Sequence, residues 1–522
     1  MGPSDQLLLR HLLWRMEHVH RSAQLVAPAH SQLSPRVSRT FAETADRCRF
    51  LAAQLAMLGI SSSSRVVTLA WNSIEHLEVL LTVPAMGATI NSLNVRMDTE
   101  TLLDLAFPNA AAVVVDALLL DDEGELGDTA RAVVARAASS GIPVIVIGDS
   151  RNLPGEPPLR YHELVGGGDN PKYSWPDLRE TSVAFVLHTG GTTGKPKSYE
   201  VSHRAAMLHA LAQLTADAAG FSSRDRVLPL APLFHVNAWG HPLAAIMAGA
   251  DIILCGRDMT PARVAHMLAD EEVTVACAVP TVWHDVCAAI GRDGGPRPRH
   301  LREVITGGSA VPAAVKEGVE EVLGARVAAA WGMTETLACS TYERLDPTEG
   351  AGIPIPLIEL RTTPRPPDVP SAGESGVLEV RGPLVVGRPR ADGWLDSGDL
   401  ATYQAGGHLK IHDRVKDMIK SGGEWISSVD LEQHLRSHPQ ISSVAVVARP
   451  DSRWMERPIA YVVRTDASVD GHELKNFLSA RVPRWWIPDA FMFVDDLPRT
   501  GVGKIDKPAL RNGCLSQTRR NS

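Results

Sequence analysis

The chain has 522 residues, of which 44% are hydrophobic and 21% charged, and its formal net charge is −8. This length exceeds what one simple core accommodates, so we expect two or more domains in a globular protein of ordinary composition. The negative charge balance, with no dense run of Lys and Arg, argues against broad nucleic-acid binding.

The first twenty residues predict an amphipathic helix and not a signal peptide, because Arg10, Arg15 and Glu17 interrupt the apolar residues. No run of 18 or more uncharged apolar residues occurs, so we expect no membrane span. The six cysteines are scattered and form no Cys-x-x-Cys pair. This pattern favours reduced thiols in the cytoplasm over a disulfide framework or a zinc site.

Short apolar runs alternate with helical patterns from residue 65 onward, and this rhythm predicts an α/β fold with mainly parallel sheets. The expected strands, apolar on both faces, cover 65–70, 110–116, 143–149, 182–188, 301–308 and 325–331. The expected helices cover 76–88, 261–270 and 311–324.

The pattern changes after the Pro- and Gly-rich stretch 361–376, where short alternating strands predict a small β-barrel-like subdomain. A second change lies near Asp413, beyond which about a hundred residues mix helices and strands. We therefore expect a large N-terminal domain over 1–412 and a small, mobile α+β lid over 413–522.

The stretch HTGGTTGKPK (188–197) is the first candidate for a functional loop. It follows a predicted strand, and glycine amides, two threonines and a lysine can together surround an anion. A Walker loop is excluded, because Thr189 stands where that motif needs glycine and Lys195 is followed by proline. A flexible linker is also disfavoured, because both flanks look like core. The loop therefore predicts phosphate binding by a different motif.

Further motifs, in chain order, give this loop a context. Together with it they resemble the adenylate-forming superfamily, and in particular its fatty-acid CoA-ligase branch. The resemblance covers nearly the whole chain, from residue 40 to residue 507. The motifs are GATINSLNVR (87–96), PLFHVNAWG (232–240), WGMTET (331–336), GWLDSGD (393–399), DRVKDMIKSGGEWIS (413–427) and PRTGVGKIDK (498–507).

The resemblance implies that a carboxylate attacks the α-phosphate of ATP, giving an acyl-adenylate and pyrophosphate, and that the acyl group then passes to coenzyme A. Both first reactants are anionic, so the site needs positive charge, hydrogen-bond donors and Mg²⁺. It implies that Lys504 bridges the two anions, that Glu335 binds Mg²⁺, and that Thr334 is a further catalytic residue. Taken alone, Lys504 would be an exposed loop lysine and Glu335 a solvated residue at a helix start.

The resemblance also implies which residues bind ATP and AMP. Gly307 and Gly308 would leave room for adenine beside the aromatic Trp331, and Asp399 with Arg414 would bind the ribose. The full nucleotide set is Thr189, Gly190, Gly191, Thr192, Thr193, Gly194, Lys197, Gly307, Gly308, Ser309, Ala330, Trp331, Gly332, Met333, Thr334, Asp399, Arg414 and Lys504.

Two further sets follow from the resemblance. The acyl site would comprise His235, Val236, Asn237, Trp239, Gly308 and Gly332. The coenzyme A tunnel and hinge would comprise Asp413, Lys420, Ser421, Gly422, Gly423, Glu424 and Trp425. His235 is equally well explained as a pocket residue or a core histidine, and His241 is interpreted as structural.

Three positions depart from the family pattern: Gly190 replaces a serine, Ser198 replaces a glycine and Ser397 replaces a threonine. The Ser397 exchange keeps the hydroxyl, whereas the other two bear on ATP affinity. The reaction class is unaffected.

Several alternatives remain open. The enzyme could stop at acyl-AMP, or pass the acyl group to a carrier-protein thiol, and its acid could be apolar and fatty-acid-like or a bulky polycyclic or polyketide-like one. A P-loop kinase is disfavoured by the missing Walker spacing, and a non-catalytic binding protein by the presence of Glu335, Asp399 and Lys504. A homodimer and an acyl carrier protein are open as partners.

Overall fold

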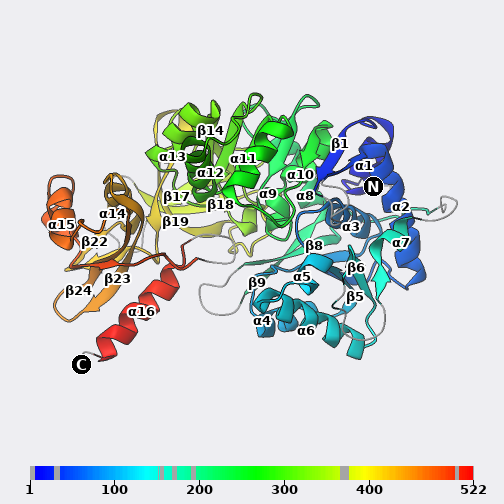
Figure 1. Cartoon of the computed structure of the whole chain (residues 1–522), viewed down its shortest axis with the longest axis horizontal. Helices are drawn as coiled ribbons and strands as arrows, with labels where there is room; N and C mark the ends of the chain where they lie inside the picture. The colour runs from blue at the N-terminus through cyan, green and yellow to red at the C-terminus, as the bar shows by residue number, and fades with distance from the viewer. Residues whose placement is uncertain are drawn as a thin grey trace.

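The computed structural model describes residues 6–28, 36–150, 152, 158–166, 173–189, 196–364, 375–499 and 505–520. Two large sheets with flanking helices occupy most of the molecule, and the C-terminal residues form a smaller body at one end (Figure 1). The predicted α/β architecture with a separate small domain is confirmed.

A seven-stranded sheet forms the lower part of the large domain in Figure 1. All its strand pairs are parallel except β8–β9, which forms an antiparallel hairpin at one edge. Its central strands are buried on both faces, which explains why the sequence shows continuous apolar runs there. In spatial order its strands are β7 (Leu159–Arg160), β6 (Val144–Ile147), β5 (Ala110–Asp116), β3 (Arg65–Leu69), β4 (Thr89–Ser92), β8 (Val183–Thr189) and β9 (Lys197–Ser202).

A nine-stranded sheet forms the second half of the large domain. Its middle strands are parallel, and antiparallel strands close both edges. In spatial order they are β16 (Ile353–Pro354), β15 (Thr341–Glu343), β14 (Arg326–Trp331), β13 (Glu303–Gly307), β12 (Val275–Ala278), β10 (Arg226–Pro229), β11 (Asp251–Ile253), β1 (Gln24–Ala27) and β2 (Val37–Thr40).

Helices pack on these sheets through apolar faces. The N-terminal helix α1 buries Leu12, Leu13 and Met16, as its amphipathic pattern predicts. The segment predicted as one helix over 311–324 is divided, because α13 ends at Gly318 and a π-helical turn continues to Leu323. The helices of the large domain are α1 (Arg10–His18), α2 (Phe41–Met57), α3 (Ile74–Ala85), α4 (Thr99–Ala106), α5 (Ala117–Leu120), α6 (Glu125–Ser139), α7 (Tyr161–Val165), α8 (His203–Gln213), α9 (Val236–Trp239), α10 (His241–Ala248), α11 (Pro261–Asp270), α12 (Pro280–Asp293) and α13 (Ala313–Gly318).

The small β subdomain is a four-stranded antiparallel sheet. It consists of β17 (Glu359–Thr363), β18 (Gly376–Arg381), β19 (Leu395–Tyr403) and β20 (Leu409–Arg414). Strand β20 runs to Arg414, so this sheet extends two residues beyond position 412, where the sequence places the end of the large domain.

The lid that follows is a mixed sheet with three helices. Strand β24 lies between β23 and β21, and β25 also pairs with it. The elements are β21 (Ile419–Ser421), β22 (Glu424–Ile426), α14 (Ser428–Arg436), β23 (Ile441–Asp451), β24 (Met455–Arg464), α15 (Gly471–Ser479), β25 (Ala490–Phe493) and α16 (Lys507–Arg520).

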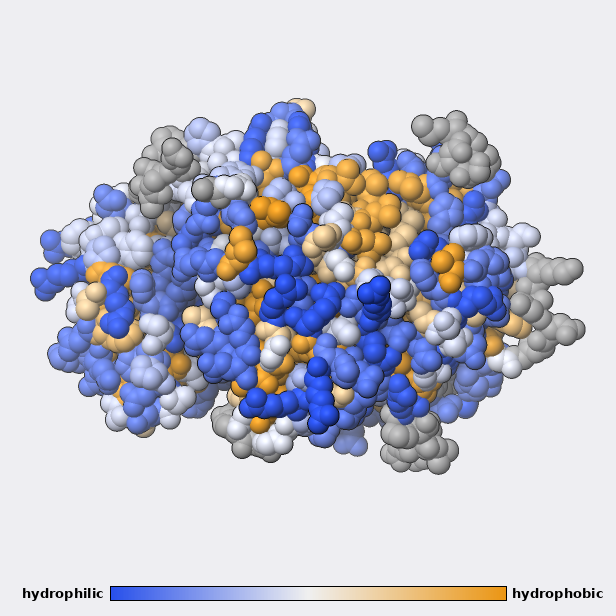
Figure 2. Space-filling view, turned by 90° about the horizontal axis from the view of Figure 1, so that it is seen from above, coloured by the Kyte–Doolittle hydropathy of each residue, from blue (hydrophilic) through white to orange (hydrophobic). Residues whose placement is uncertain are grey.

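Seen from above, hydrophobic residues gather on the large domain, whereas the lid at the left is mostly hydrophilic (Figure 2). Within the described ranges, every helix is too short or too polar to cross a bilayer. Five cysteines in those ranges are free and buried, as expected for reduced thiols.

Candidate functional site

The predicted phosphate loop connects the two strands of the β8–β9 hairpin. Thr189 ends β8, Lys197 begins β9, and the two residues face each other in the antiparallel register. Gly190, Gly191, Thr192, Thr193 and Gly194 lie outside the described residues. The hairpin therefore fixes both ends of this loop.

Glu335 lies next to this hairpin. It is in a short 3-10 turn (Thr334–Thr336) that follows β14, and its backbone carbonyl accepts a hydrogen bond from the Val386 amide at 2.7 Å. Its Oε1 accepts a hydrogen bond from the Tyr199 hydroxyl at 2.5 Å. The structure thus brings the predicted metal carboxylate to the strand that begins at Lys197.

Tyr199 is a site residue that the sequence analysis did not identify. Burial and the adjacent Glu335 carboxylate raise the pKa of its phenol, so the hydroxyl stays protonated and donates. Alternation along a strand puts residues 197 and 199 on the same face of β9. That periodicity could have singled out Tyr199 beside the lysine.

The predicted ribose residues are also brought together. Asp399 on β19 is only 5% exposed. Its Oδ2 accepts a hydrogen bond from Trp331 Nε1 at 2.8 Å, and its Oδ1 lies 3.1 Å from Nε of Arg414, its partner in the β19–β20 register. A carboxylate oxygen accepts hydrogen bonds, which is the chemistry that ribose hydroxyls require, and the ribose role of Asp399 remains a prediction.

The hydroxyl of Ser397 makes two hydrogen bonds, one of them to the backbone of Asp399. Its Oγ donates to the Leu378 carbonyl at 2.7 Å and accepts from the Asp399 amide at 3.1 Å. Replacing the usual threonine by serine therefore leaves Asp399 positioned.

Ser198, another departure from the family pattern, has a defined partner. Its Oγ lies 3.0 Å from Nδ1 of His188, whose Nε2 lies 2.6 Å from Oδ1 of Asn91. Burial lowers the pKa of His188 to about 4, so the ring is neutral, donates from Nε2 and accepts from the serine hydroxyl. Ser198 thus ties the start of β9 to β8 and β4.

Two predicted binding glycines also have a backbone reason to be glycine. A Cβ on Gly307 would lie 2.3 Å from the Ala330 carbonyl oxygen, and one on Gly332 would lie 2.6 Å from backbone atoms of Ala338 and Cys339. Neighbouring backbone, therefore, already excludes a side chain at both positions. Gly308 has φ +86°, which favours glycine, and its place beside adenine remains a prediction.

The chain after Glu335 is strained. Leu337, Ala338 and Cys339 all have positive φ, a conformation that costs free energy in residues other than glycine. Gln213 on α8 donates to the Cys339 carbonyl at 3.0 Å and accepts from the buried Tyr342 hydroxyl at 2.5 Å. These contacts hold the turn, and with it the backbone around Glu335, in place.

The predicted acyl segment forms α9 and the turn before it. Val236 and Trp239 are buried and have positive φ. His241 is fully buried, with its ring 6.1 Å from that of Trp239 and 5.4 Å from that of Phe221. Burial lowers its pKa to about 3, which supports the structural interpretation of His241.

The predicted coenzyme A segment is a hairpin. Ser421 pairs with Glu424 across a two-residue turn in which Gly422 and Gly423 both have positive φ, as a type I′ turn requires. The Lys420 ammonium lies 5.3 Å from the Trp425 ring centroid. The hairpin is joined to the lid sheet at Ser421, which pairs with Met455 of β24.

A magnesium site built from protein alone is not present among the described residues, where no three Asp, Glu, His or Cys side chains come together as metal ligands. Mg²⁺ is commonly held by one or two carboxylates together with substrate phosphates and water. Glu335 beside the phosphate hairpin fits that mode. Lys504, the predicted catalytic lysine, lies outside the described residues.

Comparisons with known proteins agree over nearly the whole chain. The family model "AMP-binding enzyme" matches residues 17–388, and "AMP-binding enzyme C-terminal domain" matches residues 430–504. A medium-chain-fatty-acid–CoA ligase of Ectopseudomonas oleovorans is 34% identical, with 97% of this chain and 96% of the relative covered. A long-chain-fatty-acid–CoA ligase of Thermus thermophilus is 36% identical over 90% of this chain and 89% of the relative.

Solved structures show the same fold. The anthranilate CoA ligase AuaEII in complex with anthranoyl-AMP superposes with a TM-score of 0.86 at 21% identity, covering 99% of this chain and 100% of that one.

Proposed function

Because this chain belongs to the AMP-binding enzyme family, we propose that it is an AMP-forming acyl-CoA ligase that activates an apolar, fatty-acid-like carboxylic acid. The observation that carries the proposal is that three motifs lie together: the β8–β9 hairpin of the glycine-rich loop (188–197), WGMTET (331–336) and GWLDSGD (393–399). Glu335 contacts the phosphate hairpin through Tyr199, and Asp399 contacts Trp331.

In the first step a carboxylate oxygen of the acid forms a bond to the α-phosphorus of ATP, and the bond from that phosphorus to pyrophosphate breaks. Thr189, Lys197 and the glycine-rich loop would hold the β- and γ-phosphates, and Asp399 with Arg414 the ribose. Glu335 would hold Mg²⁺, which would supply positive charge to the phosphates. The Lys504 ammonium would bridge the carboxylate and the α-phosphate.

In the second step the sulfur of coenzyme A attacks the acyl carbon, and AMP leaves with the electron pair of the broken carbon–oxygen bond. The Gly422–Gly423 hairpin and Lys420 would lie along the pantetheine arm. His235, Val236 and Trp239 would line the acyl site. Val236 and Trp239 are buried, and an apolar lining favours an apolar acid.

There are two candidates for the class of carboxylic acid that is activated. The two relatives described above are named for medium- and long-chain fatty acids, whereas the superposed structure is named for anthranilate, an aromatic acid. A bulky aromatic acid is therefore the second candidate. Release of acyl-AMP or transfer to a carrier protein, and assembly as a homodimer, are alternatives for the same site. The free, buried cysteines support a reducing compartment such as the cytoplasm.

The test is carboxylate-dependent exchange between ATP and pyrophosphate, run with fatty acids of increasing length and with benzoate-like acids, followed by thioester formation with coenzyme A. We expect fatty acids to give the highest kcat/KM. We also expect Lys504→Ala to lose at least about a hundredfold in exchange, the scale seen when one preorganised transition-state contact is removed. Exchange by Lys504→Ala within tenfold of the wild type would refute the role of Lys504. Exchange without thioester would indicate an adenylating enzyme only.

A further inference from the structure

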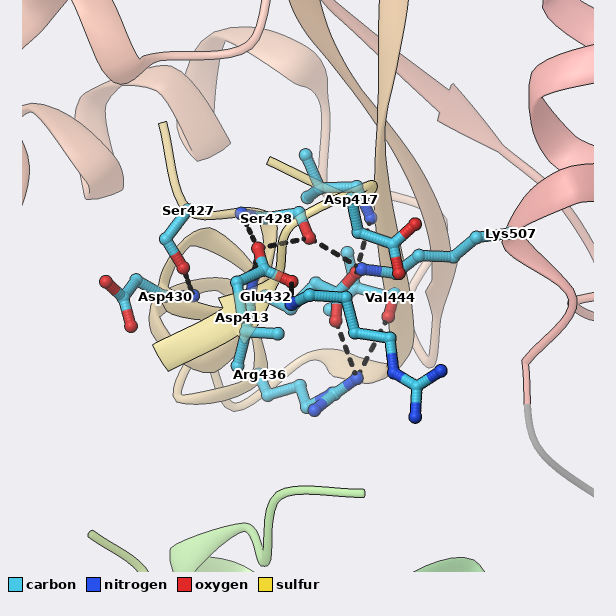
Figure 3. Close-up of polar contacts among 12 residues, drawn as sticks. Asp413, Asp417, Ser427, Ser428, Asp430, Glu432, Arg436, Val444 and Lys507 are labelled. Atoms are coloured by element: carbon cyan, nitrogen blue, oxygen red, sulfur yellow. Dashed lines mark hydrogen bonds and ion pairs between the residues drawn. The ribbon is translucent and has the colours of Figure 1, made fainter. Parts of the chain in front are cut away.

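A buried cluster of charged side chains lies where the lid begins (Figure 3). Asp413 is 2% exposed and Glu432 is 4% exposed. Lys507, from the C-terminal helix α16, points into the same cluster, and its side chain is 14% exposed. Buried charges are found mainly where they are paired and hydrogen-bonded, so each contact here matters.

Asp413 binds the start of helix α14. Its Oδ2 accepts hydrogen bonds from the Ser428 amide at 2.7 Å, the Ser428 hydroxyl at 2.8 Å and the Val429 amide at 3.3 Å. The first amides of a helix have no partner within the helix. A side chain of strand β20 therefore completes the N-terminus of α14.

Lys507 joins the same group from the other side. Its Nζ lies 2.8 Å from Oε1 of Glu432 on α14 and donates to the Ser428 hydroxyl at 2.7 Å. The same Glu432 oxygen accepts from the Val446 amide on β23 at 2.8 Å. Strand β20 and helices α14 and α16 therefore meet at one hydrogen-bonded centre.

A second contact from α16 reaches the chain just after β20. Arg511 follows Lys507 by one helical turn, on the same face, and pairs with Asp417. The segment 413–417 is thus contacted by α16 directly at Asp417 and through Ser428 at Asp413.

The next side chain along β20 points the other way. Arg414 pairs with Asp399 of the large domain, 3.1 Å away, and successive side chains of a strand lie on opposite faces. Asp413 therefore contacts the lid and Arg414 contacts the ribose carboxylate of the large domain.

We infer that Lys507 is a positioning residue that, with Asp413, Ser428 and Glu432, fixes the segment 413–417 to the lid so that they move as one body. A turn of the lid then bends the chain on the N-terminal side of Asp413, while the cluster stays intact. It breaks the Arg414–Asp399 ion pair, the last β19–β20 pairs at Asp413 and Arg414, and the hydrogen bond from the Val415 amide to the Gly398 carbonyl. This inference rests on the proposed two-step function, in which one lid serves both steps. A purely stabilising ion cluster is the alternative.

The test compares Lys507→Met with the conservative variant Lys507→Arg. Lys475, an exposed lysine on α15, provides the matched control Lys475→Met. At a temperature where all variants are folded, we expect Lys507→Met to lower kcat for acyl-CoA synthesis by about tenfold or more while KM for ATP and acid changes less than about threefold, because the residue contacts no substrate. Lys507→Arg should recover most of the loss, and Lys475→Met should match the wild type.

A second measurement does not depend on activity. Hydrogen exchange of the amides of residues 413–429 should be about tenfold faster in Lys507→Met, with strand β12 unchanged. Should Lys507→Met fail to fold, Lys507→Met/Glu432→Gln removes both charges of the pair while keeping an acceptor for the Val446 amide, and the same outcomes apply to it.

The outcomes distinguish a positioning role of Lys507 from a purely stabilising ion cluster. A kcat within twofold of the wild type, or unchanged exchange over 413–429, would overturn the positioning role. Equal changes of exchange in β12 and in 413–429 would also overturn it, since they indicate general destabilisation. If the wild type makes no acyl-CoA, the proposed function fails. The hydrogen-exchange measurement alone still decides whether the cluster holds the segment 413–417.

Discussion

Glu335 depends on a neighbour that is distant in the sequence. Tyr199 donates to its carboxylate across a sequence separation of 136 residues. Because the phenol pKa is raised, this donor is retained over the whole working pH range. The contact orients one carboxylate oxygen, and a carboxylate is the kind of ligand that a hard cation prefers.

We predict graded effects at this contact. Glu335→Gln keeps the shape but loses the charge, so it should raise the Mg²⁺ concentration needed for half-maximal exchange by about tenfold or more. Tyr199→Phe removes only the orienting hydrogen bond, worth about 1 kcal/mol. It should raise the half-maximal Mg²⁺ concentration by roughly fivefold. The measurement is pyrophosphate exchange titrated with Mg²⁺. The same half-maximal concentration in Glu335→Gln and the wild type would exclude Glu335 as the metal residue.

The surroundings of Asp413 also change the pKa of its carboxyl group. Burial, opposed in part by Lys507, raises its pKa from 3.8 to about 6. A carboxyl with a raised pKa binds its proton more tightly in the folded chain than in the unfolded one. Its stabilising contribution is therefore complete below the unfolded pKa and is lost as the pH rises through about 6.

The corresponding prediction uses Asp413→Asn, whose amide does not titrate. Between about pH 4 and pH 7 the wild type should lose up to about 3 kcal/mol of unfolding free energy relative to this variant, since one unit of pKa shift corresponds to about 1.4 kcal/mol. Urea unfolding of both proteins over this range provides the measurement. Parallel pH profiles would show that Asp413 titrates normally.

At the scale of elements, the β21–β22 hairpin shows how turn geometry and packing combine. Arg457 on β24 donates to the Ser421 hydroxyl at 2.9 Å and to the Trp485 carbonyl at 2.7 Å, and these contacts anchor the hairpin. A Cβ on Gly422 would lie 2.7 Å from the Trp454 ring, whereas one on Gly423 would meet nothing within 4 Å.

These two glycines form a matched pair for a test. Both alanine variants carry the strain of positive φ, of the order of 1 kcal/mol, but only Gly422→Ala must also displace Trp454. We expect Gly422→Ala to slow thioester formation from supplied acyl-AMP by about tenfold or more, and Gly423→Ala to have a smaller effect. Pyrophosphate exchange should stay within about threefold of the wild type in both. Equal loss in both half-reactions would separate the hairpin from the coenzyme A step.

For the molecule as a whole, the arrangement consists of a large two-sheet body and a lid joined through β20. Asp399, the predicted ribose residue, and the cluster around Asp413 lie on opposite faces of this connection. In the proposed function, two successive reactions at one site require room first for the predicted bridging lysine and then for a thiol. A change of lid orientation meets both needs.

This predicts a measurable change of distance. Fluorophores attached through Ser139→Cys on α6 and Lys475→Cys on α15, both exposed positions, in a Cys514→Ser background should give different transfer efficiencies with a non-reactive acyl-AMP analogue and after coenzyme A is added. The other five cysteines are buried, so labelling should be selective. Identical efficiencies in both states would mean that the lid keeps one orientation.

The fold class and the order of the motifs follow from the sequence, and the reaction class follows from the resemblance that those motifs carry. Continuous apolar runs such as 110–116 identify strands buried on both faces, because periodicity is a local property. The motifs likewise point to their chemistry locally, since a glycine-rich loop after a strand suits phosphate wherever it occurs. Asp399, Trp331 and Glu335 are singled out through the resemblance of their motifs to the adenylate-forming superfamily, before their positions are known.

Which of these residues meet depends on the tertiary structure. Tyr199 with Glu335, Trp331 with Asp399, and Lys507 with Ser428 are separated by 136, 68 and 79 residues. Such pairs depend on sheet order and helix packing, which no local pattern contains. Gly307 illustrates the same limit, because the Ala330 carbonyl of the neighbouring strand β14 explains why it lacks a side chain. Burial, and with it the raised pKa of Asp413, likewise arises only when β20, α14 and α16 come together.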